Sequence, residues 1–313
     1  MNARDTMRLP RISARSWTIL QSIGVNIEDS ADVFEIAKLV KNLFRHSGFE
    51  LLRLPTAIPR PANGDYSNLG EQLVIRDHLD KMPVEHRFCV DIAASGGVRM
   101  SNTFALFKGG WSGLAVEGNP SMFAELARAY SLFSTVNLAK CMVTPQNVIA
   151  LLEANGTPVE FGFLNLDIDS YDYFVLERVL ERYRPALICA EVNEKIPPPV
   201  KFTVQWDPKF VWAGDHFYGQ SIAKLHELCI RFNYSLTQLH YNNAFLVPAE
   251  ICQMPALTPE QAYRLGYADK PDRTTLFSWN ADMDSVLNLG PEDALIHIRK
   301  YFSKYQGKYQ LYL

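Results

Sequence analysis

The sequence predicts an α/β fold built on an open, mostly parallel sheet of seven strands that ends in an antiparallel hairpin. Short apolar runs alternate with helical patterns from Phe88 onward, as a parallel sheet requires. The first run ends in small residues, which would let a ligand approach the backbone at the carboxyl end of the strand. The last two runs are separated by Asn242-Asn243, and asparagine tolerates the positive φ angles of a tight hairpin.

The first strand and its neighbour form the unit that predicts a nucleoside half-site. Phe88 to Ile92 is a short apolar run typical of a buried strand, and the small loop Ala-Ala-Ser-Gly-Gly follows it. A helix is expected from about Ser101 to Lys108, and the next apolar run, Leu114 to Val116, closes on Glu117. An acid at that strand end is placed to accept hydrogen bonds from two ribose hydroxyls.

The other elements continue the alternation. The expected strands are 135–141, 161–168, 186–192, 235–240 and 244–247, and the expected helices between them are 120–130, 145–153, 173–182 and 221–232. Further helices are expected at about 31–45, 69–81 and 291–304. Pro197-Pro198-Pro199 predicts a long irregular loop to about Asp215, because proline lacks the N–H that helices and strands use.

The pattern divides the chain into three parts. Residues 1–80 are expected to form a helical N-terminal extension that packs beside the main domain or acts as a lid over it. Residues 81–250 hold the alternating strands and helices. Residues 251–313 are aromatic-rich and are expected to pack on the domain as a C-terminal extension.

Composition limits the classes of function. The chain has 313 residues, of which 48% are hydrophobic and 21% charged, as in a soluble globular protein. A net charge of -3 and the absence of a Lys/Arg cluster argue against nucleic acid as a partner. No apolar run approaches the length of a membrane span. The five scattered cysteines are typical of reduced core residues, so a cytoplasmic location without a membrane partner is expected.

These residues resemble the class I S-adenosylmethionine-dependent methyltransferases, whose Rossmann-like seven-stranded sheet ends in such a reversed hairpin. Within that class, the segments VDIAASGG, SNTFALF, GWSGLAVEGNP and LDIDSYD are similar to the FkbM-type branch. The resemblance covers roughly 66–248. It departs from the usual pattern at Ala93, where glycine is usual, and at Ser95, where an acid or glycine is usual. The family implies O-methylation of a sugar or another small natural product.

The expected site residues follow from these motifs. The residues expected to bind S-adenosylmethionine are Asp91, Ala93, Gly97, Glu117 and Asp167. Met142 and Val143 could flank the adenine. Methyl transfer from a sulfonium also needs a device that lowers the pKa of the acceptor alcohol. Either a divalent cation or a positioned base would serve.

Both devices have candidate residues. Asp167 and Asp169 end one strand, and Glu191 and Asn193 end the next, so their oxygens would suit magnesium. The expected metal ligands are Asp167, Glu191 and Asn193, and the alternative is that these residues cap helices and bind cofactor. Asp169 and His216 are the expected catalytic residues, with His216 as the base if no metal binds. Four aromatic residues near His216 in the sequence could form the wall of an acceptor pocket or anchor the loop: Trp206, Trp212, Phe217 and Tyr218.

Two other functions share parts of this pattern. A nicotinamide-dependent oxidoreductase would use the same first half-site, but the loop does not fit GxGxxG and the chain has no Tyr-x-x-x-Lys pair. A non-catalytic methyltransferase-fold binding protein would explain the departures at Ala93 and Ser95. The acids at 167, 169 and 191 argue against it, because a dead site has no need to hold negative charge together. The expected partner is a small-molecule acceptor, and the oligomeric state stays open, a homo-oligomer included.

Overall fold

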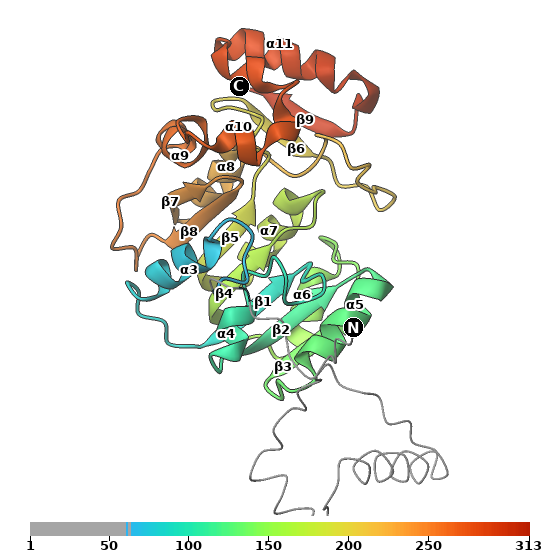
Figure 1. The fold of residues 1–313 in the computed structure, drawn as a ribbon, viewed down its shortest axis with the longest axis vertical. Coiled ribbons are helices and arrows are strands. Elements are labelled where there is room, and N and C mark those ends of the chain that lie inside the picture. The colour runs from blue at the N-terminus through green and yellow to red at the C-terminus, as the bar shows by residue number, and fades with distance from the viewer. Residues whose placement is uncertain (1–60, 62–63) are drawn as a thin grey trace, which may run out of the picture. The chain divides into compact units, whose positions relative to one another are not determined.

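The computed structural model describes residues 61 and 64–313, all of which belong to one compact unit, Ala57–Leu313 (Figure 1). The helix expected at 31–45 lies outside the described residues. The strands are β1 (Phe88–Ile92), β2 (Ser112–Glu117), β3 (Val136–Lys140), β4 (Glu160–Leu166), β5 (Arg184–Glu191), β6 (Lys201–Val204), β7 (Tyr234–His240), β8 (Asn243–Pro248) and β9 (Tyr309–Tyr312).

The helices occupy most of the expected places with shorter bounds. The α-helices are α3 (Glu71–Leu79), α4 (Phe104–Lys108), α5 (Pro120–Tyr130), α6 (Val148–Ala154), α7 (Asp172–Leu180), α8 (Ile222–Phe232), α9 (Pro259–Tyr263), α10 (Arg273–Leu276) and α11 (Pro291–Tyr301). The other helical turns are η1 (Arg264–Ala268), η2 (Ser278–Asn280), η3 (Asp284–Asn288) and η4 (Ser303–Tyr305). Among the described residues, no helix is long and apolar enough to cross a membrane.

The predicted seven-stranded, mostly parallel sheet with a terminal antiparallel hairpin is confirmed. Its strand order is β3-β2-β1-β4-β5-β8-β7. β1 to β5 run parallel, and β8 pairs antiparallel with both β5 and β7 as the terminal hairpin. β4 and β5 are neighbours, as the sequence predicts, so the residues that follow these two strands meet at one edge of the sheet.

Two helical layers cover the sheet because its buried side chains alternate between faces. On β1, Val90 and Ile92 join the apolar cluster that also takes side chains from α6, α7 and α8. Cys89 joins the opposite cluster, to which α3, α4 and α5 contribute. Caps fix two of the helix starts: the Asn119 side chain accepts from the N–H groups of Ser121 and Met122 at α5, and Ser221 caps α8.

The chain winds in opposite directions from β1 and β4, the two central strands. From β1 it proceeds through β2 to β3, and from β4 it proceeds through β5 to the hairpin. The loops after β1 and β4 therefore leave the sheet on either side of a topological switch point. In open α/β sheets this crevice, at the carboxyl ends of the strands, is where ligands bind.

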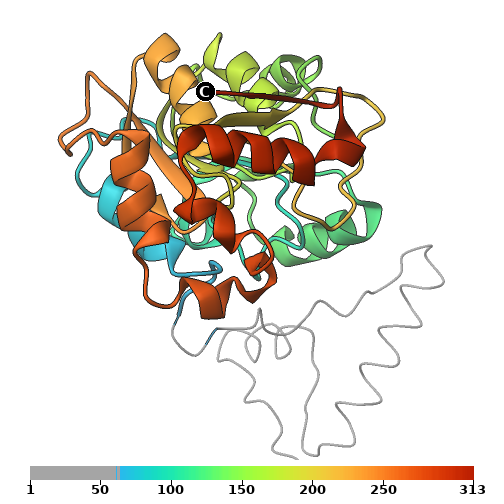
Figure 2. The ribbon, with the colours of Figure 1, turned by 90° about the horizontal axis from the view of Figure 1, so that it is seen from above.

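Two expectations about connections are wrong in detail. The positive φ of the hairpin falls on Tyr241 (φ 54), just before Asn242-Asn243, because β8 already begins at Asn243. The loop expected to be irregular from Pro197 to Asp215 contains β6, which pairs antiparallel with β9 at the far end of the chain. β6, β9 and α11 form a C-terminal layer. Figure 2 shows α11 and the terminal strand lying together in this layer.

The C-terminal layer has an apolar core of its own. Phe202 of β6, Phe217 and Phe302 are buried together, with Ile298 of α11 beside them. The ring of Tyr305 stacks on Phe217 at a centroid distance of 3.8 Å. Because β6 follows β5 directly, this layer packs at the end of the sheet where β5 and its site residues emerge (Figure 1).

Candidate functional site

The loop after β1 has a backbone turned toward the left-handed region at three residues. Ala93 has φ 70, Ser95 has φ 49 and Gly97 has φ 79. The N–H groups of Ala93 and Ala94 donate to the Val116 carbonyl on β2, which bends the chain directly after the strand. Ala93 and Ser95 thus adopt the conformation that glycine favours, although both carry a Cβ.

Gly97 has a packing role in this loop. A Cβ on Gly97 would lie 2.5 Å from Leu126 Cδ1 and 2.7 Å from Tyr130 Cε1 on α5. The Tyr130 hydroxyl donates to the Gly97 carbonyl at 2.8 Å. The glycine therefore lets α5 approach the loop closely, and its expected part in cofactor binding stays a prediction.

Asp91 is buried inside β1 and holds the strands together. Its Oδ2 accepts from the Thr103 hydroxyl at 2.5 Å, and its Oδ1 accepts from Asn165 Nδ2 at 2.9 Å. Burial raises the pKa of Asp91 to about 6, the hydrogen bonds from Thr103 and Asn165 oppose the shift, and the Glu117 charge adds to it. Asp91 therefore ties β1 to β4 through Asn165 and to the start of α4 through Thr103, and its expected part in cofactor binding stays a prediction.

Glu117 lies at the end of β2 and faces the loop after β1. Its Oε2 accepts from the Ser95 N–H at 2.7 Å, and its Oε1 accepts from the Asn119 N–H at 2.6 Å. A carboxylate has about four acceptor positions, so each oxygen keeps one for a further donor. Met142, which is 67% exposed, lies next to Gly118, the residue after Glu117: a Cβ added to Gly118 would lie 2.2 Å from the Met142 sulfur. Val143 is buried in the core next to it.

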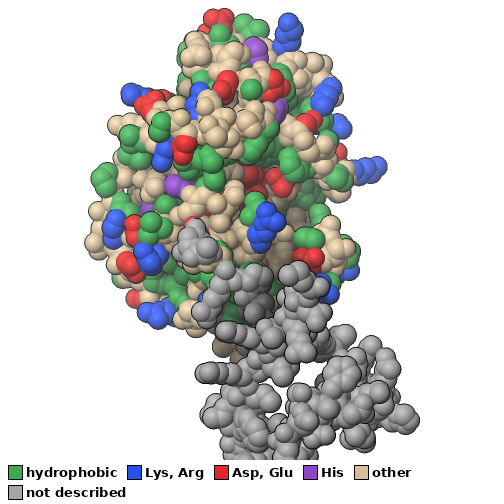
Figure 3. All heavy atoms as spheres, viewed as in Figure 1, with side chains coloured by type: hydrophobic (Ala, Val, Ile, Leu, Met, Phe, Trp, Pro, Cys, Tyr) green, Lys and Arg blue, Asp and Glu red, His purple; other side chains and the backbone are tan. Residues whose placement is uncertain are grey.

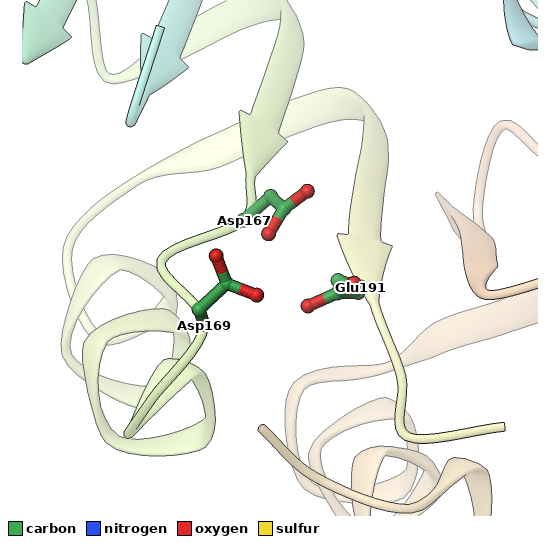
Figure 4. Close-up of side chains that lie close together, drawn as sticks. All are labelled: Asp167, Asp169 and Glu191. Atoms are coloured by element: carbon green, nitrogen blue, oxygen red, sulfur yellow. The ribbon is translucent and has the colours of Figure 1, made fainter. Parts of the chain in front are cut away.

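Three carboxylates meet at the carboxyl ends of β4 and β5. One oxygen each from Asp167, Asp169 and Glu191 lies within 4.8 Å of the others. Figure 4 shows the three side chains directed toward one another, two from the loop after β4 and one from the end of β5. In the space-filling view, acidic side chains are visible near the middle of the described part (Figure 3). The predicted meeting of these acids is therefore what the structure shows.

Burial raises the pKa of all three carboxylates, and neighbouring charges modify the shift. Burial first, and then the charges of Asp169 and Asp172, raise the pKa of Asp167 to about 8. Burial also raises the pKa of Glu191 well above its usual range, with the Asp167 and Asp169 charges adding to the shift. For Asp169, burial raises the pKa while the nearby Lys195 charge opposes the rise. Like charges held this close cannot all stay ionised without a compensating cation or proton.

Two further details show how the cluster is held. Asp169 has φ 53, a strained value for a residue with a side chain, and this turn brings its carboxylate round to the other two. Asp172 accepts from the N–H groups of Ile168 and Ser170, which fixes the turn after β4. Glu191 Oε1 accepts from Asn242 Nδ2 at 3.0 Å, and its Oε2 is buried without a hydrogen-bond partner among the described residues.

Asn193 has a structural task at this site. Its Nδ2 donates to the carbonyls of His216 and Tyr218, at 2.9 Å and 3.0 Å, and so ties the end of β5 to the loop that precedes α8. Its Oδ1 is buried without a hydrogen-bond partner among the described residues. That oxygen is the atom left for the metal-ligand role expected of Asn193, which stays a prediction.

The His216 side chain is engaged with the C-terminal layer. Its Nε2 lies 3.1 Å from Asp282 Oδ1, and its ring lies against Tyr301 at a centroid distance of 5.9 Å. The Tyr301 hydroxyl donates to the other Asp282 oxygen at 2.5 Å. The structure thus pairs this histidine with Asp282, while its backbone carbonyl is bound by Asn193. Its expected role as a base stays a prediction.

The four aromatic residues near His216 divide between the two roles foreseen for them. Phe217 is buried in the C-terminal core and anchors the loop. Trp206 packs edge-on against Tyr171 at a centroid distance of 4.3 Å. Trp212 is 41% exposed and lies edge-on to Tyr218, which is itself buried. Trp212 and the half-buried Trp206 are therefore the rings that a ligand could still contact.

Sequence reasoning missed a buried charged pair next to the cluster. Glu194 and Lys195 are 0% and 1% exposed, and they form an ion pair of 3.0 Å. Asn280, far along the chain in the C-terminal segment, donates to Glu194 at 2.6 Å. The available signal was the pair itself, two adjacent opposite charges beside a predicted buried strand. Adjacent charges in a loop usually face solvent, so the contact with Asn280 could not be foreseen.

Comparison with known proteins gives distant likenesses only. No protein-family model matches the chain, and no curated protein matches it. Among solved structures, a putative O-methyltransferase from Klebsiella pneumoniae is 14% identical, with a TM-score of 0.37 over 75% of this chain and 95% of that one. An O-methyltransferase from Bacillus cereus in complex with SAH is 16% identical, with a TM-score of 0.37 over 73% and 94%. Likenesses this distant assign neither an activity nor a substrate to this chain.

Proposed function

We propose that the protein is an S-adenosylmethionine-dependent O-methyltransferase of the FkbM-like branch that acts on a hydroxyl of a sugar or another small natural product. One observation carries the proposal: Glu117 and the Asp167–Asp169–Glu191 cluster lie at the strand ends beside the same topological switch point. The first can bind a ribose, and the second can take a proton from an acceptor alcohol. A binding protein has no use for the second group.

The residues at the switch point fit an adenosine. Glu117 keeps acceptor positions for two hydroxyls after it has bound the Ser95 and Asn119 N–H groups. The exposed Met142 beside Gly118 offers an apolar, polarisable surface of the kind that packs against an aromatic base. When bound, S-adenosylmethionine supplies a methyl group activated as a sulfonium.

The acidic cluster fits the proton chemistry of an alcohol acceptor. Transfer forms an O–CH₃ bond, breaks the CH₃–S bond and releases the hydroxyl proton, which a carboxylate must accept. Asp169 suits this task when the cluster holds no cation, because its raised pKa makes the ionised form a stronger base. Trp212, 41% exposed, would stack on a sugar or ring of the acceptor.

The cluster also fits a divalent cation, and we include magnesium in the proposal. A buried carboxylate oxygen without a donor, Glu191 Oε2, is costly unless a proton or a cation compensates it. Asp167, Asp169 and Glu191 would hold the ion, since carboxylate oxygens are the ligands magnesium prefers. When bound, such an ion lowers the pKa of a coordinated hydroxyl.

Thermal unfolding with added ligand tests the proposal. A ligand that binds only the native state raises the melting temperature. We expect S-adenosylhomocysteine to raise it, and NAD to leave it unchanged, because the loop after β1 does not fit the GxGxxG pattern that admits a pyrophosphate. Stabilisation by NAD and none by S-adenosylhomocysteine would replace the methyltransferase by an oxidoreductase. Stabilisation by neither would favour the non-catalytic binding protein.

A further inference from the structure

The turn after β5 buries two opposite charges that the proposed reaction does not use. Glu194 is 0% exposed and Lys195 is 1% exposed, and Lys195 is among the largest fully buried side chains of the described residues. Removing an ion pair from water usually costs as much as the pair returns, so a buried pair is weak evidence for a stabilising role. Its position beside the acidic cluster suggests another purpose.

Every polar atom of the pair is held. Lys195 Nζ donates to Glu194 Oε1 at 3.0 Å and to the Tyr218 hydroxyl at 2.8 Å, and the Tyr218 hydroxyl donates to Glu194 Oε2 at 2.9 Å. Asn280 Nδ2 donates to Glu194 Oε1 at 2.6 Å, and the Tyr263 hydroxyl donates to the Glu194 carbonyl at 2.5 Å. Two residues of the C-terminal segment therefore fix the orientation of Glu194, and Glu194 fixes Lys195.

The pair is tied to the same turn as the cluster. Glu194 and Lys195 follow Glu191 and Asn193 in the chain, and the Asn193 side chain donates to the Tyr218 carbonyl while the Tyr218 hydroxyl bridges the two charges, at 2.8 Å from Lys195 Nζ and 2.9 Å from Glu194 Oε2. In keeping with this position, the Lys195 charge opposes the rise of the Asp169 pKa, and the Glu194 charge adds to the rise of the Glu191 pKa. Charges inside a protein are weakly screened, so both should be felt by an ion bound between these carboxylates.

We propose that Lys195 and Glu194 are positioning residues that set how strongly the Asp167–Asp169–Glu191 cluster binds a divalent cation. Lys195 lowers the affinity by repulsion, and Glu194 raises it by attraction. The C-terminal segment, through Asn280, keeps both charges in place. The inference rests on the metal site of the proposed function and extends it to residues that need not touch the ion.

Two substitutions that each remove one charge of the ion pair test the proposal, because they should change the affinity for Mn²⁺ in opposite directions. Mn²⁺ binding is followed by electron paramagnetic resonance. We expect Lys195→Met to tighten Mn²⁺ binding about tenfold, because a nearby repelling charge is lost. We expect Glu194→Gln to weaken it by about the same factor. A purely structural role would make both substitutions weaken binding, since each would loosen the same turn.

The chain offers a matched control in a second buried lysine. Lys224 on α8 is 5% exposed, donates to Glu227 at 2.7 Å and to the Tyr312 hydroxyl at 2.8 Å, and lies over the Tyr173 ring. It repeats the Lys–Glu–Tyr arrangement on the outer helix. We expect Lys224→Met and Glu227→Gln to change Mn²⁺ affinity by less than about twofold while lowering the melting temperature similarly.

The outcomes separate this inference from the proposed function. Equal Mn²⁺ affinity in wild type, Lys195→Met and Glu194→Gln overturns the inference and leaves the metal site. Mn²⁺ binding by none of them overturns both the inference and the metal site, while S-adenosylhomocysteine binding in the same samples still decides the methyltransferase. If Lys195→Met does not fold, Lys195→Gln replaces it. If neither folds, Glu194→Gln is compared with Glu194→Asp, which keeps the charge but also loosens the turn: weaker binding by Glu194→Gln alone supports the inference, and weaker binding by both or by neither contradicts it.

Discussion

Three of the six non-glycine residues with positive φ in the described part of the chain lie at the site. Ala93, Ser95 and Asp169 have φ angles of 70, 49 and 53, in a region where a side chain costs on the order of 1–3 kcal/mol. The three lie in the loops after β1 and β4, on either side of the switch point. Strain of this kind persists where the surrounding structure enforces it, and here it turns Asp169 toward the other carboxylates.

Substitutions at Asp169 separate strain from charge. Asparagine tolerates the left-handed region better than alanine does, so Asp169→Ala should be less stable than Asp169→Asn by about 1 kcal/mol. Both substitutions remove the same charge, so the difference between them reports the backbone. Urea unfolding of the two variants measures it. Equal free energies of unfolding would mean that the backbone relaxes without cost.

The raised pKa of Asp167 makes stability depend on pH. Its pKa is about 8 in the folded protein and near the ordinary aspartate value when unfolded, so the folded state binds more protons between these values. The free energy of unfolding should therefore fall as pH rises toward 8. Asp91 and Asp172, whose pKa values are about 6, also titrate in the lower part of the window from pH 6 to 8, so the comparison with Asp167→Asn is what isolates the contribution of Asp167.

Denaturant unfolding at several pH values, with EDTA present, measures this dependence. We expect a decrease in the free energy of unfolding from pH 6 to 8 in the wild type and a smaller decrease in Asp167→Asn. Added magnesium should reduce the decrease, because a cation compensates the ionised carboxylates. A free energy that rises over this window would show that the cluster is already compensated.

At the scale of elements, the loop after β1 depends on close packing against α5. Its sequence, small residues after an apolar strand, predicted both the strand and the close approach of a ligand. The group that approaches Gly97 is the helix, through Leu126 and Tyr130. Sequence alone could not tell a ligand from a helix, because either one needs the same absence of a side chain.

A pair of glycines measures this packing. Gly97 and Gly110 have similar positive φ angles, 79 and 89, but a Cβ on Gly110 would meet nothing within 4 Å. Gly110→Ala therefore carries the backbone strain alone, and Gly97→Ala adds the overlap with Leu126 and Tyr130. We expect Gly97→Ala to lower the free energy of unfolding by about 2 kcal/mol more than Gly110→Ala does. Equal losses would contradict the packing role of Gly97.

At the scale of the whole molecule, periodicity predicted the sheet and not the layer that covers its end. The strands of the sheet are apolar runs at regular intervals, and the meeting of Asp167 with Glu191 follows from their order. β6 and β9 are four-residue strands at opposite ends of a long segment, and four residues are too few for the alternation of Lys201–Val204 to stand out from a loop. The hydrogen bond from Asn280 to Glu194 depends on that layer, so the sequence could not predict it either.

The central claim is that Glu117 binds the ribose of S-adenosylmethionine at the switch point. Calorimetric titration of S-adenosylhomocysteine into the wild type and Glu117→Gln tests it most directly. Glu125→Gln is the matched control, because the Glu125 carboxylate lies beside the same loop, near Gly96.

We expect the wild type and Glu125→Gln to bind S-adenosylhomocysteine with similar affinity. Loss of charge-assisted hydrogen bonds should cost Glu117→Gln about 2–3 kcal/mol, which weakens binding roughly 30- to 150-fold. The loop should stay folded, since glutamine keeps one oxygen for a backbone N–H. No binding by the wild type, or equal binding by Glu117→Gln, would contradict the claim.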